Sequence, residues 1–118
     1  MGTVTAKIKI SNPSIPKNNY EGEFLVDTGA KYSVVPEYIW KKLAIKPDRV
    51  QEFSLADGTI ITRPIGSAFI EYQGIKSTTP LVLGSPKDSF LLGVVTLENL
   101  GLSINPFTRE IYNAKLLM

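Results

Sequence analysis

Cysteine and histidine are both absent from this chain of 118 residues. Their absence excludes thiol nucleophiles, disulfides, Ser-His-Asp triads and the ordinary zinc sites that these two residue types build. Any chemistry must therefore use carboxylates, hydroxyls, lysines or the backbone. No metal and no cofactor is implied.

Long apolar runs and concentrated charge are also lacking. No stretch approaches the roughly 20 apolar residues that a membrane helix needs. Residues 1–7 alternate between polar and apolar side chains, unlike a signal peptide. We therefore expect a cytoplasmic protein with no membrane partner. The net charge is only +2 and the lysines are scattered, so no nucleic-acid partner is expected.

What is present fits one soluble globular domain over residues 1–118. The hydrophobic fraction is 43% and the charged fraction 20%, which are ordinary values for such a domain. The length is close to the common domain size and allows a real core.

Period-two alternation and turn residues predict mostly strands. Residues 4–10 alternate apolar and polar, and the Asp-Gly step within 51–65 is a strong hairpin signal. We expect strands at 4–10, 20–26, 52–55, 59–62, 67–72, 75–83 and 110–117, with a buried apolar run at 90–95. The fold class predicted is all-β, as a closed barrel.

Two short helices interrupt the strands. Pro36 suits the first position of a helix that continues to Leu43. Thr96 is expected to cap a second helix, which Gly101 ends. An apolar strand, a glycine-bearing turn and a short helix thus occur at 24–43 and again at 90–101.

The segment around Asp27 has the most informative chemistry in the sequence. Three apolar residues, 24–26, lead directly into Asp27, Thr28, Gly29 and Ala30. A carboxylate at the end of a buried strand lowers stability unless it is hydrogen-bonded or shares its charge with another group. The Thr28 hydroxyl can tie its loop to a neighbouring one. The small residues Gly29 and Ala30 let backbone and water approach the carboxylate.

With Leu91-Leu92-Gly93 and the helical segment 97–100 some 60 residues further on, the chain resembles the retropepsin-like aspartic proteases. The resemblance covers nearly the whole chain and is closer to cellular and prokaryotic relatives than to viral members. It implies that Asp27, Thr28 and Gly29 form the catalytic loop. It also implies that the hairpin 51–65 is a flap over the substrate.

The resemblance further implies an aspartic endopeptidase that acts on polypeptides as a symmetric homodimer. Peptide hydrolysis of this type needs two carboxylates, and the chain has one Asp-Thr-Gly. Asp57-Gly58-Thr59 has the wrong order and indicates a hairpin turn. Each chain would contribute Asp27 at the twofold axis, and the pair would share one proton. Ala30 and the hairpin residues Ala56, Asp57 and Gly58 are the substrate-binding residues implied.

Several alternatives stay open at this stage. The hairpin is either a flap or an ordinary surface hairpin. Tyr32 is either core or the edge of the cleft, and Trp40 is expected in the core. The strand 110–117 either joins the dimer sheet, which the apolar tail 116–118 favours, or closes its own barrel.

Two departures from the family bear on function. Lys31 stands where retroviral enzymes usually carry an acidic residue that contacts substrate, and Val94 replaces an arginine of an interface ion pair. The rival function is therefore a catalytically silent peptide-binding or dimerisation domain on the same fold. A plain structural β-barrel must explain away the whole motif set.

Overall fold

The computed structural model describes residues 3–115 of the chain. Its strands and helices follow one another as β1 (Thr5–Ser11), β2 (Asn19–Val26), β3 (Ser33–Val35), α1 (Glu37–Lys42), β4 (Arg49–Ser54), β5 (Ile60–Tyr72), β6 (Ile75–Leu83), β7 (Leu91–Leu92), α2 (Val94–Asn99), β8 (Leu102–Ile104) and β9 (Ile111–Asn113).

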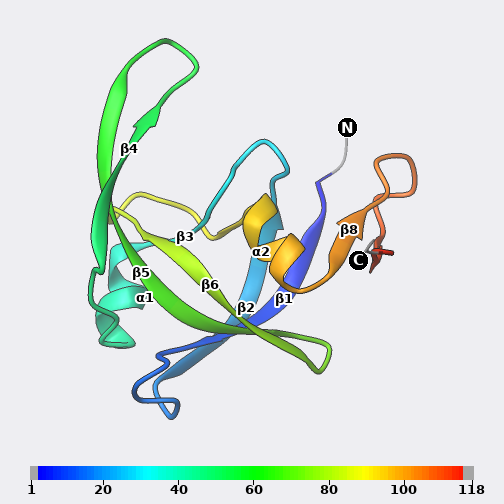
Figure 1. The fold of residues 1–118 in the computed structure, drawn as a ribbon, viewed down its shortest axis with the longest axis horizontal. Coiled ribbons are helices and arrows are strands. Elements are labelled where there is room, and N and C mark those ends of the chain that lie inside the picture. The colour runs from blue at the N-terminus through cyan, green and yellow to red at the C-terminus, as the bar shows by residue number, and fades with distance from the viewer. Residues whose placement is uncertain (1–2, 116–118) are drawn as a thin grey trace.

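Seven of these strands form one sheet that curls until it meets itself. Their order is β1-β2-β7-β3-β6-β5-β4, and β1 also pairs with β5. The pairings therefore run around a closed ring from β1 to β5, which confirms the predicted all-β class. Strand β4 is outside the ring and pairs only with β5, and the β4–β5 hairpin projects from the body of the molecule (Figure 1).

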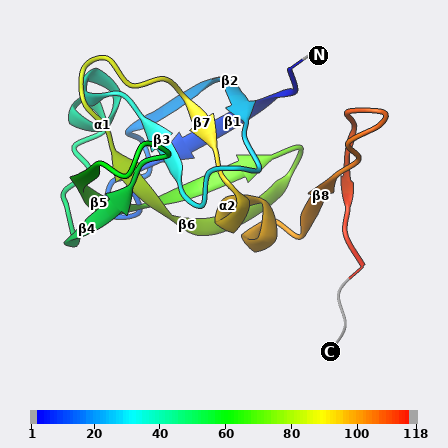
Figure 2. The same cartoon turned by 90° about the horizontal axis from the view of Figure 1, so that it is seen from above.

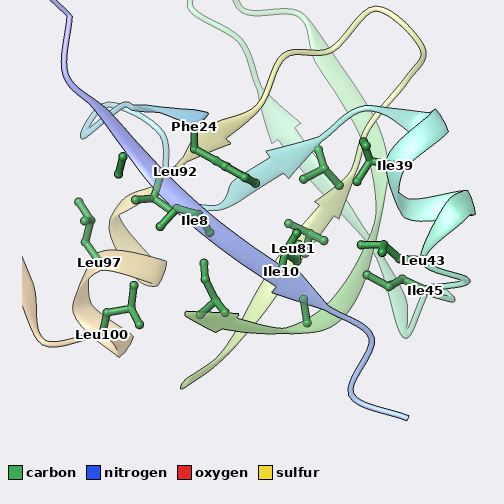
Figure 3. Close-up of a cluster of buried hydrophobic side chains, with 14 of the residues drawn as sticks. Ile8, Ile10, Phe24, Ile39, Leu43, Ile45, Leu81, Leu92, Leu97 and Leu100 are labelled. Carbon is green, nitrogen blue, oxygen red and sulfur yellow. The ribbon is translucent and has the colours of Figure 1, made fainter. Parts of the chain in front are cut away.

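The core fills the ring, as period-two alternation in β1 predicts. Ala6, Ile8 and Ile10 are buried, whereas the residues between them are exposed. Helices α1 and α2 contribute Ile39 and Leu97 from opposite ends of this cluster (Figure 3). Because both helices pack against the same core, the positions of α1 after β3 and of α2 after β7 are fixed.

Neither helix spans more than six residues. Within residues 3–115, none of the helices has the length and apolar character that crossing a membrane requires.

The helix starts differ from those predicted. Pro36 is the N-cap of α1, with extended backbone at φ −70° and ψ 162°, and the helix begins one residue later. The prediction that Thr96 caps α2 is wrong. Gly93 is the N-cap, Val94 starts the helix, and Thr96 is completely buried inside it. The Thr96 hydroxyl forms hydrogen bonds with other parts of the fold and not with the backbone at the start of its own helix.

The predicted strands 59–62 and 67–72 are in fact one strand, β5. It continues through Pro64 and Gly66 because its two halves have different neighbours. Its first half pairs with β4 and its second half with β6 and β1. The long strand thus connects the projecting hairpin directly to the barrel wall.

The last strand does not close the barrel. Strand β9 pairs with β8 in a separate two-stranded ribbon, which stands apart from the seven-stranded sheet (Figure 2). Its bounds, Ile111–Asn113, are much shorter than the predicted 110–117. The apolar tail at 116–118 lies outside the described residues.

Candidate active site

Asp27 directly follows the end of β2, which lies between β1 and β7 in the sheet. Strands β2 and β7 run parallel, with Val26 paired to Leu92. The Asp27 N–H then donates to the Leu92 carbonyl at 3.0 Å. The pairing thus extends one residue past β2 and fixes the backbone that carries the carboxylate.

The loop after Asp27 folds back on the carboxylate itself. The Gly29 N–H donates to Asp27 Oδ1 at 2.9 Å, and the Ala30 N–H donates to the Asp27 carbonyl at 3.1 Å. The Asp27 side chain is half-buried, and Thr28 and Gly29 are exposed. This turn uses Oδ1 and leaves Oδ2 available to other groups.

Gly93 lies directly beneath this loop. A Cβ added at Gly93 would lie 2.5 Å from the Tyr32 carbonyl carbon and 2.8 Å from the Lys31 oxygen. Two N–H groups of α2 donate to the loop, from Val94 to Ala30 at 2.9 Å and from Val95 to Lys31 at 3.0 Å. The absence of a side chain at Gly93 therefore lets the helix start approach and hold the loop.

A chain of buried hydroxyls reinforces the same contact. The Gly93 N–H donates to Ser33 Oγ at 2.9 Å. Ser33 Oγ lies 2.6 Å from Thr96 Oγ1, which lies 2.7 Å from Thr79 Oγ1. All three hydroxyl residues are buried, so each depends on the others for hydrogen bonds. The chain joins β3, α2 and β6 behind the loop.

A groove of about 400 Å³ lies between this loop and the β4–β5 hairpin. Its lining comes from the loop and β3, the hairpin, β6, and β7 with the segment before it. It includes Gly29, Ala30, Lys31, Tyr32, Phe53, Leu55, Ile61, Arg63, Val82, Asp88 and Leu91. Two hollows of about 500 and 540 Å³ elsewhere on the barrel contain none of the loop residues. Both hollows are larger than the groove, but we do not assign the active site to either of them because the Asp27 loop does not line them.

Tyr32 connects the loop to the base of the hairpin. Its ring packs edge-on against Phe53, with centroids 6.0 Å apart, and its hydroxyl accepts a hydrogen bond from Arg49 at 3.3 Å. Tyr32 is half-buried and lines the groove, so of the two alternatives it is at the edge of the cleft. Trp40 is half-buried against the core, and its indole N–H donates to the Gly84 carbonyl at 2.9 Å.

The predicted substrate-binding residues fall into two groups. Ala30 lines the groove, whereas Ala56, Asp57 and Gly58 are exposed at the hairpin turn and are not part of its lining. Asp57 Oδ1 accepts the Thr59 N–H at 2.9 Å. Hydrogen bonds from Thr59 lower the pKa of the Asp57 carboxyl. Asp57 thus stabilises the turn.

Sequence reasoning did not identify Phe53, Arg63 or Asp88 as groove residues. Arg63 Nε lies 3.9 Å from Asp88 Oδ2 across the groove wall. The alternation of β4 and β5 could have placed Phe53 and Arg63 on one face of the hairpin. Only the tertiary fold could indicate that this face is turned toward the Asp27 loop.

Comparisons with known proteins agree with this geometry. A family model described as "gag-polyprotein putative aspartyl protease" matches residues 15–99, more than half of the chain. The solution structure of simian foamy virus (mac) protease superimposes with a TM-score of 0.53 and 18% identity, covering 80% of this chain and 91% of that one. At this identity the match shows a shared fold. No curated protein sequence matches the chain.

Proposed function

The chain belongs to the gag-polyprotein aspartyl protease family, and we propose that it is an aspartic endopeptidase that works as a homodimer. The observation that carries the proposal is the Asp27 loop. It holds one half-buried carboxylate that accepts the Gly29 N–H, and the loop residues that follow it, from Gly29 to Tyr32, line a groove. One such carboxylate per chain calls for a second copy to complete the acid–base pair.

In the proposed reaction the two Asp27 carboxyls hold a water between them, one ionised and one protonated. The ionised carboxylate takes a proton from the water as its oxygen bonds to the peptide carbonyl carbon. The protonated partner gives its proton to the carbonyl oxygen. The tetrahedral gem-diol intermediate then collapses: the C–N bond breaks as the leaving nitrogen receives a proton from the first carboxyl. One gem-diol hydroxyl gives its proton to the second carboxylate as the C=O of the new carboxylic acid forms, which restores the singly protonated pair.

Charge repulsion keeps the pair singly protonated. Two carboxylates about 3 Å apart repel by roughly 5 kcal/mol at an effective dielectric near 20. Two Asp27 carboxyls so placed would therefore share one proton. We expect activity at acidic pH that declines toward neutral and alkaline pH, as the shared proton is lost.

The groove supports a polypeptide as the substrate. Apolar side chains from the hairpin and β7, such as Leu55, Ile61 and Leu91, line its walls. An extended peptide satisfies its backbone by pairing with neighbouring strands and places alternate side chains in such pockets. We propose that the β4–β5 hairpin covers the bound peptide and excludes water.

Cleavage of an unstructured protein at about pH 5, compared between wild type and Asp27→Asn, tests the proposal. We expect cleavage by the wild type and none by the variant. Cleavage that persists in Asp27→Asn contradicts the mechanism. A folded dimer that binds peptide but never cleaves it favours the silent binding domain instead.

Sedimentation of the active enzyme tests the dimer separately. A dimer is expected at the concentrations at which cleavage is observed. Full activity in a strict monomer is incompatible with a single Asp27 per site.

A further inference from the structure

Two cations gather around the ring of Tyr32. Lys31 Nζ lies 5.9 Å from the ring centroid, and the Arg49 guanidinium carbon lies 6.0 Å from it. Arg49 also donates to the Tyr32 hydroxyl at 3.3 Å. Attraction to the ring explains part of this arrangement, but it brings two like charges to one side chain.

Within residues 3–115, neither Lys31 nor Arg49 forms an ion pair. Arg49 hydrogen-bonds to the neutral Gln51 side chain at 2.6 Å. The next acidic residue on β4, Glu52, lies on the opposite face of the strand from Arg49 and Gln51, because successive residues alternate. Within the described residues, no ion pair therefore neutralises either cation at Tyr32.

The other charged groups of the groove balance each other. Arg63 Nε faces Asp88 Oδ2 at 3.9 Å, and Asp88 Oδ2 also accepts the Ser85 N–H at 2.7 Å. Because this pair is internally compensated, Lys31 is the charged residue of the lining without an ion-pair partner among residues 3–115. Arg49 approaches the same Tyr32 ring but is not itself part of the lining. Lys31 and Tyr32 themselves line it, a few residues beyond Asp27.

We propose that Lys31 and Arg49, arranged around Tyr32, form a subsite that selects an acidic side chain of the peptide, Asp or Glu, near the scissile bond. The inference rests on the proposed function for the position of the scissile bond. A peptide carboxylate that reaches either cation would accept a charge-assisted hydrogen bond from it and offset the local positive charge. Because Lys31 and Arg49 are exposed, the effect is moderate and sensitive to salt.

Binding measured without cleavage separates this inference from the proposed function. Fluorescently labelled peptides of about ten residues, with a central apolar pair flanked by Glu, Gln or Lys, would be titrated against Asp27→Asn in an anisotropy assay. The Glu peptide should bind about fivefold more tightly than the Gln peptide, and the Lys peptide should bind most weakly. Raising the salt from about 0.05 M to about 0.5 M should reduce the preference to below about twofold.

Charge reversal tests the residues. In the Asp27→Asn background, Lys31→Glu should abolish the preference for Glu and favour the Lys peptide, and Arg49→Gln should weaken the preference. Lys17→Glu makes the same charge change in the exposed β1–β2 loop, outside the groove lining. This control should keep the wild-type order of peptides. All variants alter exposed side chains, so their melting temperatures should match the parent.

The outcomes are distinguishable. A charge preference in binding with no cleavage by the wild type would contradict the protease and retain the subsite. Cleavage with equal affinity for all three peptides would retain the protease and overturn the subsite. A preference that survives Lys31→Glu, or a lack of binding to any of the three peptides, also overturns it.

Discussion

Asp27-Thr28-Gly29 and Asp57-Gly58-Thr59 contain the same three residue types and close the same local hydrogen bond. In each turn, Oδ1 of the aspartate accepts the N–H of the residue two positions later at 2.9 Å. Asp27 is half-buried at the end of β2, between β1 and β7, whereas Asp57 is exposed at a hairpin tip. Local turn geometry therefore does not distinguish Asp27, which we propose as catalytic, from Asp57, which stabilises a turn.

The difference lies in what surrounds each turn. The Asp27 loop receives hydrogen bonds from α2 and donates one to β7, and the buried hydroxyls of Ser33, Thr96 and Thr79 lie behind it. The backbone bonds of the hairpin turn are local, between Leu55 and Thr59 or Gly58. Rigid support from distant segments is what orients a carboxylate for catalysis.

Replacing each aspartate by asparagine gives the largest contrast. Asparagine keeps the oxygen that accepts the local hydrogen bond but cannot act as acid or base. Asp27→Asn should lower kcat by about 10³-fold or more, while Asp57→Asn should lower it by less than about tenfold. Steady-state cleavage of one peptide by both variants measures the difference. Equal losses in the two variants would remove the distinction between the turns.

Replacing the glycine beneath the Asp27 loop by alanine should lower the free energy of unfolding more than the same change in the hairpin turn. Gly93→Ala forces a Cβ to within 2.5 Å of the Tyr32 backbone and should destabilise the protein by about 3 kcal/mol. Gly58→Ala meets no atom within 4 Å but requires φ of +86°, so it should cost only about 1 kcal/mol. Urea unfolding of both variants tests this order, and a larger loss at Gly58 would contradict it.

Removing the central hydroxyl behind the loop should have an intermediate effect. Thr96→Val keeps the shape of the side chain but leaves Ser33 and Thr79 without their shared partner, at a cost of about 1–2 kcal/mol. Thr78→Val, at the exposed neighbouring position of β6, should change stability by less than about 0.5 kcal/mol. The same unfolding assay compares them. Indistinguishable stabilities would mean that the hydroxyl chain contributes nothing.

The smallest effect concerns the titration of Asp57. Hydrogen bonds from Thr59 lower the pKa of Asp57 below its ordinary value of 3.8. The turn is therefore stabilised above that pH, and the contribution disappears as the pH falls through the lowered pKa. The amide shift of Thr59, followed by NMR, should titrate with a midpoint below 3.8 in the wild type and stay flat in Asp57→Asn. A midpoint at or above the ordinary value would contradict the assignment.

The sequence predicted the features of this fold that are determined by residues close together along the chain. The alternation in β1, the Asp-Gly hairpin and the end of α2 just before Gly101 follow from residues close in sequence. Thr96 was misassigned because its partners Ser33 and Thr79 are 63 and 17 residues away. A short-range capping rule cannot detect such a contact.

The same reasoning explains what the sequence predicted of the site. Asp27 and its loop were identifiable from three apolar residues followed by Asp-Thr-Gly. Phe53 and Arg63 were not, because they reach the groove only when β5 carries the hairpin past the loop. Residues 56–58 were predicted to bind substrate. They lie at the hairpin turn and are not part of the groove lining, and this too depends on how the tertiary fold places the hairpin.

The most direct test of Asp27 as half of a shared site is to mix wild type and Asp27→Asn in equal amounts and let the subunits exchange. If each active site needs an Asp27 from both chains, only dimers with two wild-type subunits cleave. Activity per total protein should then fall to roughly one quarter of the pure wild-type value. A fall to only one half would mean that each chain works with its own Asp27, and would contradict the account.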